Sequence, residues 1–344
     1  MNWRLSSLLI GSLALYGQRP AVQVGTFTTI DVPGATSTNP SAINAAGVII
    51  GTYCTSSGCL GFVRNTDGTF ATLYAPDGST ANPAAINGAG VVTGSFGDEF
   101  GTHGFLWKPS GTMTIIDLPG VSSTQPSGIN AAGQIVGTYN DSSGSHGFIR
   151  AANGTVTTFD ASGTGGTSAT SINGSGAVSG CYNGQAFVRT AEGTVTLFNP
   201  PSSTNSCFPP LFYLSSATHI DAAGDVTGTY TLPSPGGGFS YAYRGFVRAA
   251  DGTITGFDAA TYPPCCDFTY VLAINAGGLI AGTENDGYNI NHGYVRLTNG
   301  NIITLDAPGA GSYGTVATAI NAVGQVTGWY NDTSNVTHGF LWKP

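Results

Sequence analysis

Short apolar runs alternate with turn residues along almost the whole chain. Between residues 127 and 160 four such runs occur, at Ser127 to Asn130, Gln134 to Tyr139, His146 to Arg150 and Thr155 to Asp160. We name them strands A, B, C and D. Runs of this length that are bounded by Gly and Asn and rich in Val, Ile, Thr, Phe and Tyr are typical of β-strands. The pattern predicts a unit of four antiparallel strands.

This unit recurs from end to end. A turn with the pattern Ile-Asn/Asp-x-x-Gly links strands A and B, and its Gly supplies the positive φ that closes a tight hairpin. The turn begins at Ile43, Ile86, Ile129, Ile172, Ile220, Ile274 and Ile320. The successive spacings of 43, 43, 43, 48, 54 and 46 residues match the length of a four-stranded propeller blade. We number these units one to seven.

The number of D strands indicates how the array ends. Turns from strand C to strand D follow only six of the seven units, and the chain stops after the seventh strand C. The segment Thr26 to Asp31 precedes the first strand A and matches Thr155 to Asp160. It is predicted to complete the last blade, which removes an open sheet edge. The sequence therefore predicts an all-β fold, a seven-bladed β-propeller with four-stranded blades in a single domain over residues 26 to 344, with the ring closed by the N-terminal strand.

The connections of such a ring divide between its two faces. The A-to-B and C-to-D turns are short and uniform and share one face, the turn face. The B-to-C and D-to-A loops share the other, the loop face, and range from a short turn near Asn183 to the stretch from Thr231 to Tyr243. Binding and catalytic residues concentrate on variable loops that a rigid scaffold holds. We expect the working surface on the loop face.

Charge excludes several classes of partner. The formal net charge is −8, charged residues make up 8% of the chain, and the only lysines are Lys108 and Lys343. Without a basic stripe, nucleic acid and anionic membrane surfaces are not expected as partners. Arg4 followed by an apolar run from Leu5 to Tyr16 predicts a secretion signal over residues 1 to 20, too short to span a bilayer, with a simple N-terminal tail as the alternative. We expect a secreted or cell-surface protein with no membrane span in the mature chain.

Six cysteines fit an oxidising compartment. Cys54 and Cys59 are close in one loop and are the favoured disulfide pair, whereas the partners of Cys181, Cys207, Cys265 and Cys266 stay open. No Cys-x-x-Cys pair or His cluster has the spacing of a zinc site. We expect neither a metal nor a cofactor.

The residues around strand C resemble a known repeat family. Ile-Asn-x-x-Gly is followed by an apolar strand ending in Gly, then by HGFLWKP from His103 to Pro109 and a near-copy from His338 to Pro344. Over residues 26 to 344 these features resemble the HAF repeats of bacterial extracellular proteins. The chain has Gly where the name-giving motif has Ala, and units one, four and five lack the His. The resemblance implies secretion and a propeller-like fold, and it carries over no catalytic residue.

Four histidines at the start of strand C each have an Asp five or six residues earlier, and units without the His lack that Asp. The pairs are Asp98 with His103, Asp141 with His146, Asp286 with His292, and Asp332 with His338. We interpret them as structural pins that close the B-to-C loop, and the two cysteines of unit one lie beside the same positions. Catalysis, metal binding and a calcium ion in each loop are the alternatives, but equivalent positions diverge around a ring whereas metal ligands must converge.

His219 replaces a small residue in strand A of unit five, where the other units have Ala, Gly or Ser. Two interpretations stay open: the side chain reaches the central channel, or it fills space beside the longer neighbouring loops.

The longest loops belong to units four to six and are rich in aromatic side chains. The predicted ligand-binding residues are Phe208, Phe212, Tyr213, Phe239, Tyr241, Tyr243, Arg244, Tyr262 and Tyr270, with Phe268 in the same group. Aromatic rings with few charges suit stacking on sugars, and Tyr and Arg are common at protein interfaces. The alternative is that the rings pack on one another as a cap.

Together these features predict a binding or interaction module, whose partner is an extracellular polysaccharide or a surface protein. Two other functions stay open: a polysaccharide-cleaving lyase or glycoside hydrolase, and a structural or self-assembling surface protein. The sequence does not decide whether the chain is an enzyme, because no nucleophile elbow, phosphate-binding loop or zinc-protease motif is present. If it is one, His219, Tyr241, Tyr243 and Tyr270 are the candidate catalytic residues.

Overall fold

The computed structural model describes residues 25–163, 165–203, 218–233, 241–259, 268–286 and 289–344. These residues form 28 β-strands and no helix, so the expected all-β class is confirmed. None of the described residues belongs to a helix that is long and apolar enough to cross a bilayer. The proposed secretion signal, residues 1–20, lies outside the described part of the chain.

Unit three illustrates the repeating architecture. β10 (Ser123–Ile129), β11 (Ile135–Asp141), β12 (Gly144–Arg150) and β13 (Val156–Phe159) pair in sequence order, each antiparallel to the next. They correspond to strands A to D. Strand A begins at Ser123, four residues before the predicted Ser127. Strands B and C are also longer than predicted: they pair as far as Asp141 opposite Gly144, because the hairpin between them needs only two residues.

The other strands follow the same order in their units. Those of units one and two are β2 (Ser37–Ile43), β3 (Ile49–Thr55), β4 (Gly58–Arg64), β5 (Phe70–Leu73), β6 (Ala81–Ile86), β7 (Val92–Asp98), β8 (Gly101–Trp107) and β9 (Met113–Ile116). Those of units four and five are β14 (Thr167–Ile172), β15 (Val178–Tyr182), β16 (Gln185–Arg189), β17 (Val195–Phe198), β18 (His219–Ile220), β19 (Val226–Pro233), β20 (Tyr241–Arg248) and β21 (Ile254–Phe257). Those of units six and seven are β22 (Phe268–Ile274), β23 (Ile280–Asn285), β24 (Asn291–Arg296), β25 (Ile302–Leu305), β26 (Ala310–Ile320), β27 (Val326–Asp332) and β28 (Thr337–Lys343).

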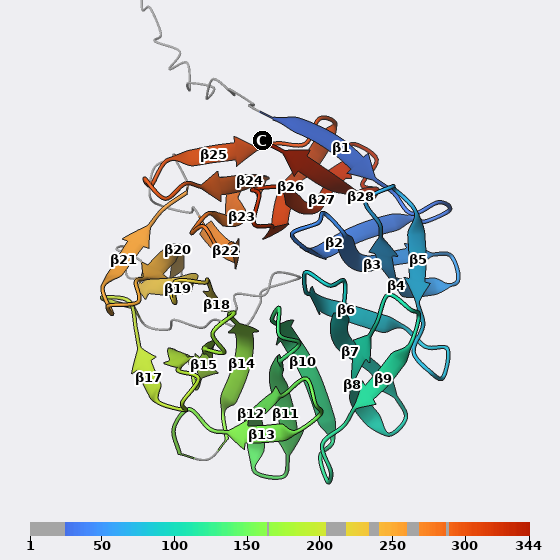
Figure 1. Ribbon diagram of the computed structural model, residues 1–344. Helices are drawn as coiled ribbons and strands as arrows, with labels where there is room; N and C mark the ends of the chain where they lie inside the picture. Colours follow the sequence, from blue (N-terminus) through green and yellow to red (C-terminus); the bar gives the residue numbers. More distant parts are fainter. Residues whose placement is uncertain (1–24, 164, 204–217, 234–240, 260–267, 287–288) are drawn as a thin grey trace, which may run out of the picture.

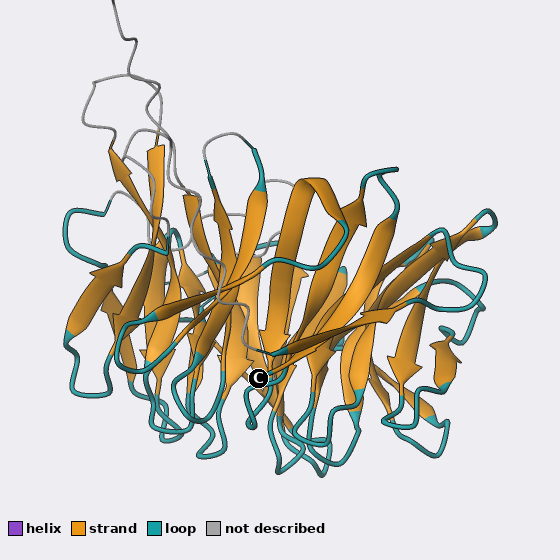
Figure 2. Cartoon of the chain, turned by 90° about the horizontal axis from the view of Figure 1, so that it is seen from above, coloured by secondary structure: helices purple, strands orange, loops and turns teal. Residues whose placement is uncertain are grey.

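The first strand of the chain pairs with the last. β1 (Thr26–Ile30) runs antiparallel to β28, with Thr26 opposite Lys343 and Ile30 opposite Gly339. Figure 1 shows β1 in blue beside the red C-terminal strands, and the units side by side around a common centre. Figure 2 shows the strands from the side, with short turns along one edge of the molecule.

The hydrophobic core lies between neighbouring sheets. Each unit buries one aromatic ring of its strand C almost completely: Phe62, Phe105, Phe148, Phe187, Phe246, Tyr294 and Phe340. Phe105, for example, packs with Val92 of its own unit and with Ile50 and Val63 of unit one. Gly137 in strand B shows how little room the Phe148 ring leaves within its own sheet, since a Cβ there would meet that ring and the carbonyl oxygen of Gln125. The ends of the strands are thereby held rigidly at both faces.

Candidate functional site on the loop face

Each loop-face histidine of units two, three, six and seven lies between two carboxylates. In unit two, His103 Nε2 is 3.1 Å from Asp98 Oδ1 in the hairpin before it, and Nδ1 is 2.9 Å from Asp117 Oδ2 at the end of strand D. The Nδ1 distances from His146 to Asp160, His292 to Asp306 and His338 to Asp31 are 2.8, 2.8 and 3.0 Å. The Nε2 distances to Asp141, Asp286 and Asp332 are 3.2, 3.8 and 3.5 Å. One imidazole thus connects a hairpin to the outer strand of its own sheet.

The carboxylate at the end of strand D was missed by sequence reasoning, although a signal exists. Strand D ends with an Asp in every unit that has His at the start of strand C, and unit five combines Arg244 with Asp258 at the same two positions. Their side chains pair at 3.0 Å. At these two positions unit one has Leu60 and Tyr74, and unit four has Gln185 and Asn199. A cation at the start of strand C therefore occurs only in units that have the carboxylate at the end of strand D.

Aromatic rings support three of these histidines from the neighbouring strand B. The imidazoles of His103, His146 and His338 stack on Phe96, Tyr139 and Tyr330 with centroid distances of 5.2, 5.0 and 5.3 Å. A ring held on its face and at both nitrogens has little freedom to turn toward a substrate. We therefore interpret the clusters as structural pins.

The carboxylates change the protonation of these groups. Hydrogen bonding to the carboxylate at the end of strand D is the largest cause of the raised pKa of His103 and His292. For His146, burial is the largest influence and lowers the pKa, but the two carboxylates outweigh it and the net pKa is raised. Hydrogen bonds donated within their own hairpins lower the pKa of Asp98 and Asp141. In His103, His146 and His292 the two flanking carboxylates therefore favour the protonated imidazole.

A disulfide holds the corresponding hairpin of unit one. Cys54 and Cys59 lie directly opposite each other on β3 and β4 and are bonded, as predicted. Cys181 is disulfide-bonded as well, and Cys207, Cys265 and Cys266 lie outside the described residues. Among the described residues, no group of three or more His, Cys, Asp or Glu side chains is arranged to hold a metal ion.

His219 occupies the inner strand of unit five. Its Nε2 is buried and has no hydrogen-bond partner among the described residues. Burial lowers the pKa of His219 to about 4, so the imidazole is neutral at physiological pH. A neutral imidazole whose Nε2 is shielded fits the space-filling interpretation, whereas the residue as a whole is half-buried. The channel interpretation remains a prediction.

The aromatic residues predicted to bind a ligand on units five and six pack on one another where the structure describes them. Tyr243 is buried, and its ring lies 5.0 Å from Phe268 and 5.4 Å from Tyr270. Burial raises the pKa of Tyr270 to about 12, and Arg244 pairs with Asp258. The remaining members lie outside the described residues, or have only their backbone described: Phe208, Phe212, Tyr213, Phe239, Tyr241 and Tyr262.

The exposed aromatic side chains are found elsewhere on the loop face. Tyr74, Phe100 and Tyr313 are 56%, 80% and 56% exposed, and they are the large aromatic side chains that the described part of the chain presents to solvent. Tyr74 follows strand D of unit one, and Phe100 forms the B-to-C hairpin of unit two. Tyr313 lies near the start of strand A in unit seven, in the irregular stretch between Ala310 and Thr315. We call them the aromatic trio. Sequence reasoning missed them because each is a single aromatic residue outside the long aromatic-rich loops of units four to six.

Comparisons with known proteins show the fold. No family model matches the chain, and no curated protein matches it. Among solved structures, a catalytically inactive variant of virginiamycin B lyase from Staphylococcus aureus with quinupristin has a TM-score of 0.62 and 14% identity, over 93% of this chain and 99% of that one. The β-propeller domain of the Trilobed protease from Pyrococcus furiosus has a TM-score of 0.57 and 10% identity, over 90% and 94%. Puromycin hydrolase has a TM-score of 0.55 and 12% identity, over 88% and 52%. The chain is a protein of the β-propeller class, and these low identities carry no activity over to it.

Proposed function

We propose that the chain is a closed seven-bladed β-propeller. The four-strand pairing in each unit and the pairing of β1 with β28 support this architecture. Unit seven also contacts unit one through the Thr318 hydroxyl, which donates to the Pro40 carbonyl at 2.9 Å. His338 pairs with Asp31, 307 residues away along the chain. The Thr318 contact repeats the bond that joins consecutive units, and the β1–β28 and His338–Asp31 contacts repeat those that join strands C and D within a unit.

On this scaffold we propose an extracellular binding module that recognises carbohydrate through its loop face. The observation that carries the proposal is the aromatic trio, whose three exposed rings all lie on that face. A flat ring covers the apolar face of a sugar at little cost in conformational freedom. The disulfide between Cys54 and Cys59 and the N-terminal sequence support an extracellular location.

Catalysis is the less favoured function. The four loop-face histidines each contact two carboxylates of their own sheet at 2.8 to 3.8 Å, which leaves them poorly placed for proton transfer to a substrate. Self-assembly is a further alternative for an exposed apolar surface. The experiment below separates all three.

Native electrophoresis through gels that contain single soluble polysaccharides tests the proposal. The wild type should be retarded by at least one polymer, and polymer length should not change. The triple variant Tyr74→Ala/Phe100→Ala/Tyr313→Ala should lose retardation, because half-covering each ring contributes roughly 1 kcal/mol, about fivefold in affinity.

The control variant is Val323→Ala, which trims a 63% exposed side chain on the turn face and should behave as the wild type. If the polymer is shortened, the proposed function is catalysis and not binding. If the wild type forms oligomers in polymer-free gels and the triple variant does not, the proposed function is self-assembly. Unchanged retardation of the triple variant would refute recognition through the aromatic trio.

A further inference from the structure

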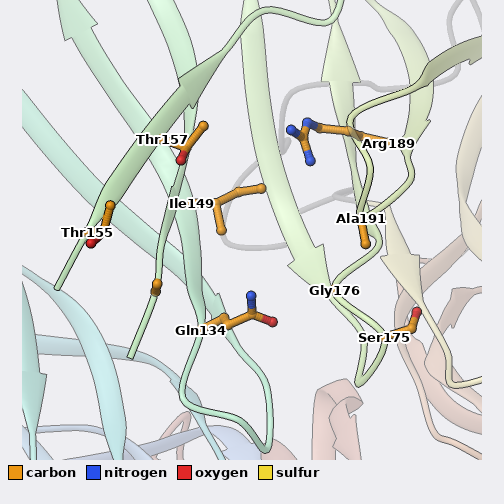
Figure 3. Close-up of a pocket in the computed structure, with 9 residues that line it drawn as sticks. Gln134, Ile149, Thr155, Thr157, Ser175, Gly176, Arg189 and Ala191 are labelled. Carbon is orange, nitrogen blue, oxygen red and sulfur yellow. The ribbon is translucent and has the colours of Figure 1, made fainter. Parts of the chain in front are cut away.

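A polar cleft opens between units three and four, on the side of the turn face. Its volume is about 340 Å³, which is within the lower range of small-molecule sites. The polar side chains that line it are Gln134, Thr155, Thr157, Ser175 and Arg189. Figure 3 shows Arg189 reaching into the cleft from one wall, opposite Gln134 and the two threonines.

Arg189 is held in place before any ligand arrives. Its guanidinium carbon lies 5.0 Å from the ring centroid of Phe159 on the preceding unit, and its Nη1 donates a hydrogen bond to the Thr190 carbonyl at 3.1 Å. A guanidinium carries five N–H groups, so most remain for a ligand. Because its position is set by these contacts, little conformational freedom is lost on binding.

The other polar groups of the cleft also have defined roles. Gln134 Oε1 accepts a hydrogen bond from Asn130 Nδ2 at 2.8 Å, which leaves the amide N–H groups of Gln134 as donors. The Ser175 hydroxyl donates to Asn173 Oδ1 at 2.8 Å, which leaves its oxygen as an acceptor. Thr157 of β13 and Thr155, directly before that strand, add two hydroxyl groups. One cation therefore stands beside both donors and acceptors.

The charge of the cleft is unusual for this chain. The protein has 18 acidic residues against ten Lys and Arg, yet no Asp or Glu lines the cleft. Between units five and six, Asp225 occupies the position of Gln134 and accepts a hydrogen bond from the Ala250 N–H. Between units seven and one, Gln325 is retained, but Arg64 there interacts with Asp67. At the junction of units three and four, Glu192 occupies the position of Asp67, but it does not line the cleft. The cleft lining itself therefore combines an arginine and an amide with no carboxylate.

We propose that this cleft binds a sugar acid, with the carboxylate on Arg189 and the ring hydroxyls on Gln134, Ser175 and the two threonines. A uronate residue presents both kinds of group within one small ring, and arginine is the side chain best suited to a carboxylate. The site is on the opposite face from the aromatic trio. It therefore stands even if recognition through the loop face fails.

Isothermal titration calorimetry with digalacturonate, and with galactobiose as the neutral counterpart, tests this proposal. Digalacturonate should bind at least 10-fold more tightly than galactobiose, and added NaCl should weaken it. Arg189→Gln should lower the affinity about 10-fold, by loss of a charge-assisted hydrogen bond. Arg150→Gln is the matched control, because Arg150 ends strand C of unit three in the same way but does not line the cleft, and it should bind as the wild type.

Gln134→Leu provides a second variant if Arg189→Gln unfolds, and it should weaken digalacturonate several-fold while leaving Arg189 in place. The proposal is overturned if the wild type gives no binding heat, if galactobiose binds as tightly, or if Arg150→Gln loses as much affinity as Arg189→Gln. Sodium sulfate that binds as tightly as digalacturonate would reduce the cleft to a general anion site. If the aromatic-trio variant loses digalacturonate binding while Arg189→Gln binds as the wild type, the sugar acid binds at the loop face and not in the cleft.

Discussion

At the scale of single residues, the loop face depends on imidazoles that bridge two carboxylates. A neutral imidazole has one N–H and can donate to only one of them, whereas the protonated ring donates to both. In His103 the two contacts are 2.9 and 3.1 Å, and in His146 they are 2.8 and 3.2 Å. Both rings therefore hold hairpin and outer strand together best when charged.

This geometry predicts a stability that depends on pH. The pKa values of His103, His146 and His292 are raised above the ordinary 6.5, so their contribution is complete below about pH 6.5 and is lost as the pH rises through the folded-state values. Asp98 and Asp141 have lowered pKa values, so their contribution is present above about pH 4 and is lost on further acidification. His219, with its lowered pKa, acts in the opposite direction below about pH 6.5. We expect the three histidines with raised pKa values to outweigh it, so that the Tm is higher at pH 5.5 than at pH 8.5.

The measurement is thermal unfolding from pH 4 to pH 9, followed by circular dichroism. The variant His103→Gln/His146→Gln/His292→Gln should have a lower Tm at pH 5.5 and a smaller decrease between pH 5.5 and 8.5. An equal decrease in wild type and variant would mean that other groups set the pH dependence.

At the scale of secondary-structure elements, a bulge in strand A directs one side chain toward the next unit. The register of strand A shifts between Pro126 and Gly128, which leaves Ser127 as the extra residue. Its hydroxyl donates to the Ala169 carbonyl of unit four at 2.7 Å. Ser41, Thr170 and Thr318 are the extra residues of other units and donate likewise to the units that follow them. Bulges commonly re-aim a side chain in this way.

Ser127→Ala should therefore lower the free energy of unfolding by about 1 kcal/mol, because one inter-unit hydrogen bond is lost. Unit two has Ala84 at the same position of its bulge, and Ala84→Ser should be neutral or stabilising. Urea titration of both variants measures the difference. Equal midpoints for Ser127→Ala and the wild type would show that the bulge hydroxyl does not link the sheets energetically.

At the scale of the whole molecule, a belt of asparagines from the A-to-B turns links one unit to the next. Each side-chain amide donates to the main-chain carbonyl of the matching residue in the next unit. The donors are Asn44, Asn87, Asn130, Asn173, Asn275 and Asn321, the last of which donates to Asn44. Unit five has Asp221 instead, and an ionised carboxylate cannot donate. The belt is therefore interrupted between units five and six.

Asp221→Asn should raise the free energy of unfolding by about 1 kcal/mol by supplying the missing donor to the Asn275 carbonyl. Burial raises the pKa of Asp221, so ionisation opposes folding as the pH rises above the ordinary value near 3.8, and the gain should be larger at pH 7 than at pH 4. Urea unfolding at both pH values measures it. Asn87→Asp is the reverse control and should destabilise the protein, and a destabilised Asp221→Asn variant would contradict the belt.

The sequence by itself determined the features that depend on neighbours along the chain. Turn glycines, alternating strands and their spacing predicted the all-β class and the four-stranded unit, because a hairpin closes through local backbone geometry. Cys54 and Cys59 are predicted as a pair for the same reason. The pairing of β1 with β28 followed from counting strands, although those strands are at opposite ends of the chain.

Only the tertiary structure decided which distant side chains meet. The second carboxylate of each histidine depends on the register in which strand D pairs with strand C. The Phe159 ring over which Arg189 lies and the cleft between units three and four depend on how sheets pack face to face. The bulge of strand A decides which hydroxyl reaches the next unit. Exposure was equally hidden, since Tyr243 is buried while Phe100 is exposed. Sequence composition reports how much aromatic surface a chain has, whereas packing decides which rings face water.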